Sequence, residues 1–96
     1  MTKQDNSFAR EIEVLELETL DAIYKGQKNE VIQLYAKVEQ LFVRGGSYTR
    51  SLIASIFIFP ISQLLERNYS WGHEYLVLFP SQLRAEYCRQ INSCGS

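Results

Sequence analysis

Apolar residues recur at helical spacing along most of the chain. The clearest case is the segment 29–44, where apolar side chains return every three or four residues and polar side chains occupy the opposite side. A single apolar stripe of this kind is typical of an amphipathic helix packed against a core. The stripe consists of Val31, Leu34, Tyr35, Val38, Leu41 and Phe42.

The segment 47–67 is apolar on almost every side. It is rich in β-branched and aromatic residues, which also suit a buried strand. Its length without a turn signal favours a helix, because a lone strand would have no pairing partner. Pro60 lacks a backbone N–H and therefore predicts a kink in this helix. A helix that is apolar all round is central in a bundle, so we expect Ile56 and Phe59 to be buried.

Three further helices complete the prediction. The first spans 7–25 and stops at Gly26, and a short one spans 73–79 after a turn at 68–72. The last helix has Pro80 in its first turn. The last helix carries Leu83, Tyr87 and Ile91 on one face. The predicted fold is all-α: a compact bundle of four to five helices around a central, proline-kinked hydrophobic helix. We expect a single domain over 1–96, with frayed tails at 1–6 and 93–96.

Composition narrows the classes of function. The 96 residues are 46% hydrophobic and 22% charged, as in an ordinary globular domain, and the net charge is −1. Residues 1–39 carry a net charge of −3 and residues 40–96 a net charge of +2. These values exclude a DNA-coating, metal-dense or disulfide-dense protein, because none of the required residues is abundant.

The N-terminal sequence and the cysteines indicate a cytoplasmic location. The first ten residues contain no apolar run of the kind that a secretory signal needs. The longest apolar run, 52–59, is much shorter than the roughly 20 residues of a spanning helix, so no membrane association is expected. Cys88 and Cys94 are expected to be free thiols that bind no metal.

No catalytic, metal or cofactor site is predicted. The single histidine, His73, could pair with Glu74 or Cys88 as an acid, base or nucleophile, but such a pair also needs an orienting group and a pocket. A packing or capping role for His73 is the simpler interpretation. The chain is therefore expected not to be an enzyme.

The first helix carries two apolar stripes. One stripe, suited to the core, contains Phe8, Ile12, Leu15, Thr19 and Ile23. The other lies nearly opposite and is bordered by carboxylates, which leaves two interpretations: a helix covered on both sides, within the bundle or in a homodimer, or a docking surface for a basic partner. On the second interpretation, carboxylates can also stand in for phosphates in the substrate groove of a nuclease. The predicted partner-binding residues are Glu13, Glu16, Leu17, Leu20, Asp21 and Tyr24.

Five arginines of the second half lie near aromatic residues and could be taken as an RNA-stacking surface. Because they are spread over three predicted helices, solvated faces and helix-end charges explain them more simply. We therefore expect no nucleic-acid binding.

The order of features from Val31 to Ile91 resembles a family of small bacterial helical proteins of immunity and antitoxin gene neighbourhoods. The features are a helix ending in LFVRGGS, the packed segment TRSLIASIFIFPISQLL, and a late proline before LRAEY. The resemblance implies an all-helical fold and a binding role. The expected function is that of a cytoplasmic immunity protein that occludes a cognate toxin, such as a nuclease of a contact-dependent or polymorphic system. The alternatives are a helical adaptor or dimerisation domain and, last, a small enzyme.

Overall fold

Helices account for nearly all of the described chain. The computed structural model describes the backbone of residues 3–95 and the side chains of residues 8–91, and within that part it contains no strand. The elements are α1 (Lys3–Tyr24), α2 (Lys28–Arg44), α3 (Ser47–Ile53), the π-helical segment η1 (Ala54–Ile58), α4 (Phe59–Arg67), α5 (Tyr69–Leu76) and α6 (Ser81–Gly95). Since α3, η1 and α4 follow one another without a break, the described chain forms five helical rods. The all-α prediction is confirmed.

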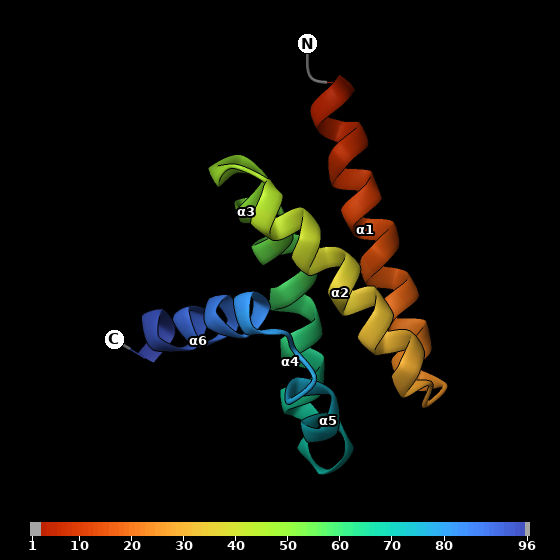
Figure 1. The fold of residues 1–96 in the computed structure, drawn as a ribbon. Coiled ribbons are helices and arrows are strands. Elements are labelled where there is room, and N and C mark those ends of the chain that lie inside the picture. Colours follow the sequence, from red (N-terminus) through yellow and green to blue (C-terminus); the bar gives the residue numbers. More distant parts are fainter. Residues whose placement is uncertain (1–2, 96) are drawn as a thin grey trace.

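The helices α1 and α2 lie side by side as an antiparallel hairpin (Figure 1). The turn between them is fixed by Gly26, whose φ of +71° suits glycine, and whose N–H donates to the carbonyl of Ile23. The N–H of Gln27 reaches back to the carbonyl of Ala22. These two bonds form a Schellman cap, so the predicted end of the first helix at Gly26 is confirmed.

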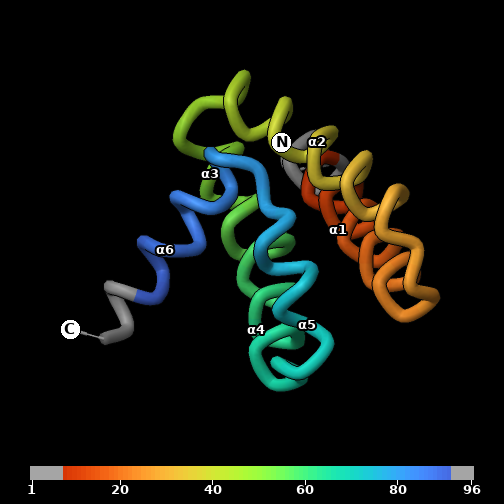
Figure 2. Tube along the Cα trace, turned by 60° about the horizontal axis from the view of Figure 1, so that its bottom comes forward, coloured from red at the N-terminus to blue at the C-terminus, as the bar shows by residue number. Residues whose placement is uncertain are grey.

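The stretch α3–η1–α4 contacts every other helix. In this stretch α3 packs on α2 and α1, η1 packs on α1 and α6, and α4 packs on α5 and α6 (Figure 2). The residues that fill the space between the rods are fully buried: Ile12, Val31, Tyr35, Val38, Ile53, Phe57, Ile58, Ile61, Leu65 and Leu83. The radius of gyration of 13.1 Å is close to that of a compact domain of this size.

The same stretch is 21 residues long and has a mean hydropathy of 1.3 over its most apolar window, enough to cross a membrane by length and composition. The core helix of a globular bundle has the same properties, and this one is contacted from several sides. The expectation that the protein does not bind membranes stays a prediction.

The structure does not show a proline kink at Pro60. Instead, the turn before the proline is widened: the N–H of Phe59 donates to the carbonyl of Ala54, five residues earlier. The extra residue in this turn changes which side chains face the core. Phe59 is 46% exposed and Ile56 is only partly buried, so the predicted burial of Phe59 was wrong and that of Ile56 holds only in part.

The predicted turn at 68–72 was also wrong. Only Asn68 interrupts the helices, and its side-chain amide donates to the carbonyl of Leu64 at 2.9 Å, at the end of α4. The helix α5 then starts at Tyr69, earlier than the predicted start at 73. Gly72 is buried inside this helix, and a Cβ there would lie 2.3 Å from the carbonyl oxygen of Leu65. The glycine therefore permits close packing of α5 on α4.

Two predictions fall wholly or partly on residues outside the described set. The expected tails, 1–6 and 93–96, have no described side chains, although the helices themselves run from Lys3 and to Gly95. Cys94 lies outside the described side chains, while Cys88 is an exposed free cysteine.

Candidate partner-binding surfaces

The two apolar stripes of α1 face opposite environments. Ile12, Thr19 and Ile23 are buried, as expected for the core stripe. In the opposite stripe, Leu17 is 58% exposed and Tyr24 is 66% exposed. The monomer therefore does not cover the second stripe, which we call the outer face of α1 and define by Glu13, Val14, Glu16, Leu17, Leu20, Asp21 and Tyr24.

The apolar residues of the outer face are not equally exposed. Val14, Leu17 and Tyr24 stand out from the surface, whereas Leu20 packs partly against the core. The ring of Tyr24 lies 6.3 Å from that of Trp71 on α5, centroid to centroid. The surface therefore continues from α1 onto the partly buried Trp71.

The carboxylates of the outer face differ in their surroundings. Glu13 and Glu16 make no ion pair with any described side chain, whereas Asp21 pairs with Lys25 at 3.1 Å. Partial burial, and then the charge of Glu13, raise the pKa of Glu16 above its ordinary value. The negative charge available to a partner is therefore concentrated at Glu13 and Glu16, and the predicted contribution of Asp21 is weakened by its own cation.

A small hollow of about 290 Å³ adjoins these carboxylates. It is lined by Ala9, Arg10 and Glu13 of α1 and by Ile56 of η1. Ile56, which is only partly buried, lines this hollow. The outer face of α1 thus combines exposed apolar side chains, free carboxylates and a shallow depression.

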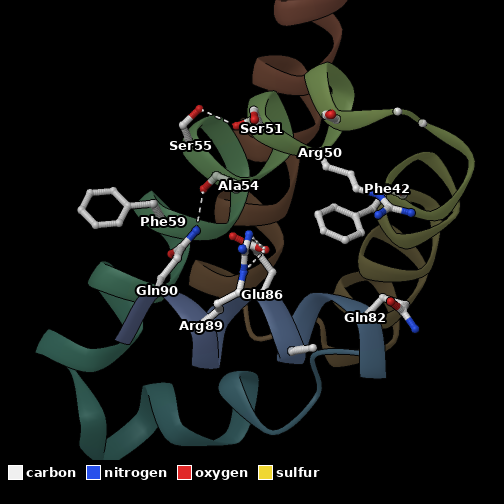
Figure 3. A pocket seen from close by; sticks show the side chains of 14 residues that line it. Phe42, Arg50, Ser51, Ala54, Ser55, Phe59, Gln82, Glu86, Arg89 and Gln90 are labelled. Carbon is white, nitrogen blue, oxygen red and sulfur yellow. Dashed lines mark hydrogen bonds and ion pairs between the residues drawn. The ribbon is translucent and has the colours of Figure 1, made fainter. Parts of the chain in front are cut away.

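A larger groove, of about 1060 Å³, lies between α3–η1 and α6 and ends at Phe59 (Figure 3). Its walls carry mostly small or uncharged polar side chains, among them Ser51, Ala54, Ser55 and Gln90. Gln90 crosses from α6 and donates to the carbonyl of Ala54 at 3.2 Å. Small side chains line the α3–η1 wall, whereas Ala85 is the small residue of the α6 wall.

Charges in this groove are few. Arg89 is engaged by Glu86, with Nη2 at 2.8 Å and Nε at 3.2 Å from the same carboxylate oxygen. Arg50 lies at the α2 end, where its Nε donates to the carbonyl of Phe42 at 3.1 Å and its guanidinium carbon lies 5.5 Å from the centre of that ring. Arg50 is therefore the cation in the groove lining that no carboxylate neutralises among the described side chains.

The predicted minor candidates are dispersed. His73 is exposed, with its ring 4.8 Å from that of Tyr69, and Glu74 forms an ion pair with Lys28. Within the described residues, no group of three His, Cys, Asp or Glu side chains could hold a metal ion. Among the described residues, His73 forms no hydrogen bond or ion pair with Glu74 or with Cys88, the two partners considered from the sequence.

The sequence singled out α1 but missed the groove. From the sequence, Arg50 was interpreted as a solvated arginine. Phe59 was interpreted as a core residue, because the widened turn before Pro60 cannot be recognised in the apolar pattern. The glycine pair Gly45-Gly46 beside the groove signalled only a turn between helices.

A family model described as a domain of unknown function, DUF7674, matches residues 2–93. The chain belongs to the DUF7674 family. No curated protein and no solved structure is significantly similar to it. The family match covers nearly the whole helical bundle. It does not by itself connect the chain with immunity or with toxins.

Proposed function

We propose that this DUF7674 protein is a non-catalytic binding protein whose outer face of α1 docks on a basic, partly apolar surface of another protein. The sequence resemblance makes a cognate bacterial toxin, such as a nuclease of a contact-dependent or polymorphic system, the expected partner. Neutralisation would then occur in the cytoplasm by occlusion, since covering the substrate groove of the toxin requires no reacting group on the inhibitor.

The observation that supports the proposal is the grouping, on the outer face of α1, of exposed apolar side chains and of carboxylates that are unpaired among the described side chains. Isolated exposed apolar residues are normal on protein surfaces, but Val14, Leu17 and Tyr24 lie on one face of one helix. They are accompanied by Glu13 and Glu16, whose charges have no partner among the described side chains. Apolar anchors with a charged rim are the arrangement found in protein–protein interfaces.

The roles of the two kinds of side chain differ. Anchors such as Leu17 and Tyr24 contribute most of the binding energy, often about 2 kcal/mol or more each, because they are desolvated on docking. Rim charges such as Glu13 and Glu16 mainly set the association rate and its dependence on salt. For Glu16, pairing with a cation of the partner would also offset the cost of its partial burial.

Co-expression with the product of the adjacent gene tests the proposal. We expect the wild-type chain to co-purify with that product and to protect cells from it. The double variant Leu17→Ala, Tyr24→Ala should dissociate faster and fail to protect, whereas the matched variant Ile32→Ala, Val43→Ala, on the exposed face of α2, should behave as wild type. A folded outer-face variant that still protects would refute the choice of surface.

The same outer face could instead form a homodimer, which was the alternative left open by the sequence. Sedimentation of the isolated chain separates the two cases. Concentration-dependent dimerisation that the Leu17→Ala, Tyr24→Ala variant abolishes would favour the dimerisation domain over the toxin inhibitor.

A further inference from the structure

Arg50 is held in a fixed orientation with part of its hydrogen-bonding capacity unused. Its Nε is engaged by the carbonyl of Phe42, and its guanidinium lies over the ring of the same residue, which is 6% exposed. The two Nη groups donate to no acceptor among the described residues. A guanidinium that is oriented in advance loses little entropy when it binds a carboxylate through two parallel hydrogen bonds.

Phe59 marks the other end of the groove. Its side chain is 46% exposed and projects away from the helical stretch (Figure 3). It follows Arg50 by nine residues, and at 1.5 Å per residue the two positions are about 13 Å apart along the helix. Because the Arg50 side chain extends toward Phe42 and the Phe59 ring projects to the opposite side (Figure 3), a ligand that reaches both must span more than this axial distance.

A free backbone acceptor lies between these two side chains. The carbonyl of Ser55 would ordinarily accept from the N–H of Phe59, but that N–H donates to Ala54 instead. The next residue, Pro60, has no N–H to offer. Within these described residues, the carbonyl of Ser55 thus lacks an intrahelical donor at both usual positions, and Ser55 lines the groove.

We propose that the groove between α3–η1 and α6 is a second docking surface, which binds an acidic, partly apolar segment of a partner protein. A carboxylate of that segment pairs with the Nη groups of Arg50, and an apolar side chain of the same segment packs on Phe59. The surface is distinct from the outer face of α1 and has the opposite charge preference.

Size and charge decide between classes of ligand. A volume of about 1060 Å³ is at the upper end for small-molecule sites and suits a peptide segment. A nucleic acid would require several free cations along the groove, whereas among its described lining residues Arg89 is neutralised by Glu86 and Arg50 alone is available. A second copy of this chain would give a head-to-tail contact, and this is an outcome of the test.

A phage-displayed library of random 16-residue peptides, selected on the full chain, is the probe. We expect one class of enriched peptides to contain an acidic residue and an apolar residue. Fluorescence anisotropy with synthetic copies measures the affinity. Replacing the acidic residue by its amide should weaken the affinity at least about tenfold, and Arg50→Gln should cause a similar loss. Arg50→Lys keeps the charge but not the paired donors, and should lie between.

Matched controls separate the groove from general effects. Arg67→Gln removes another exposed arginine, on α4, and Tyr48→Ser removes another exposed aromatic residue; neither side chain lines the groove. Both should leave affinity unchanged, while Phe59→Ser should weaken it. Leu17→Ala, Tyr24→Ala should also leave it unchanged, so that this proposal and the one for α1 can fail separately.

Three results would overturn the proposal. The first is a selection that yields no acidic class, and the second is an acidic class that binds Arg50→Gln as tightly as wild type. The third is self-association of the free chain in sedimentation that Arg50→Gln abolishes, because it would make a second copy the occupant.

Discussion

Truncation of the two most exposed apolar side chains of α1 should leave the isolated protein folded. Leu17 is 58% exposed and Tyr24 is 66% exposed, so less than half of each side chain is covered. Full burial of a leucine contributes about 1.5–3 kcal/mol, and the covered part of Leu17 therefore contributes about 1 kcal/mol. The Tyr24–Trp71 ring contact adds a similar amount at most.

Alanine also forms helices more readily than tyrosine, which offsets part of the loss. The variant Leu17→Ala, Tyr24→Ala should thus lose about 1–2 kcal/mol of unfolding free energy. By contrast, Ile12→Ala removes a fully buried side chain of the same helix and should cost about 2–5 kcal/mol alone. Urea denaturation followed by far-UV circular dichroism measures both values.

A loss above about 4 kcal/mol in the double variant would refute this reasoning, because only core residues cost so much. The outer face would then be part of the folded core, and the partner-binding surface would lie elsewhere. The single variants Ile32→Ala and Val43→Ala, at comparable exposure on α2, provide the reference for a surface truncation.

Three further variants test other parts of the structure. Burial and the charge of Glu13 raise the pKa of Glu16 in the folded state, so Glu16→Gln should raise the melting temperature at pH 7. This gain should vanish as the pH falls below 4.5, the ordinary pKa of a glutamate, because wild-type Glu16 is then protonated. A gain that persists in acid would contradict this. Gly72→Ala should lose about 1–3 kcal/mol in thermal unfolding, because its Cβ would meet the backbone of α4; an unchanged melting temperature would show that α5 can shift freely. Phe59→Ala should lose less than about 1.5 kcal/mol in urea, against about 3–5 kcal/mol for the fully buried Phe57; equal losses would mean that Phe59 is core after all.

The number and order of the helices followed from local patterns. The stripe of α2, from Val31 to Phe42, needs only helical periodicity and one apolar face, and both are properties of the sequence alone. The stop of α1 at Gly26 depends on a glycine cap, which is also local. The sequence pattern therefore carries most of the secondary structure.

The errors arose where one residue could serve two purposes. Gly72 resembled a turn glycine but permits a close helix contact, which depends on the position of Leu65 in space. Pro60 predicted a kink, whereas the structure has a widened turn at Ala54–Ile58, directly before the proline. This widening turns Phe59 outward, and so the groove that it borders could not be predicted from helical spacing.

The residues of the outer face of α1 were predicted from the sequence, but whether these residues are covered or exposed was left open. Two apolar stripes fit both a helix covered on two sides and a helix with a docking surface. Only the packing of α1 against α2, α3 and η1 shows that one stripe is covered within the monomer. The partial burial of Leu20 and the ion pair of Asp21 are likewise tertiary or side-chain details that a wheel projection does not contain.

The two candidate surfaces have opposite charge, which bears on how many partners the chain requires. The outer face of α1 offers Glu13 and Glu16, and the groove offers Arg50, while α1 and α6 lie on different sides of the central stretch (Figure 1). One copy therefore cannot bring its own two surfaces together. Contact between the outer face of one copy and the groove of the next would be head-to-tail and would repeat into open chains unless a ring closed. A chain that stays monomeric at high concentration and low salt, where attraction between opposite charges is strongest, would show that the two surfaces are not complementary in shape. In that case the two proposals call for two different partners, one basic and one acidic.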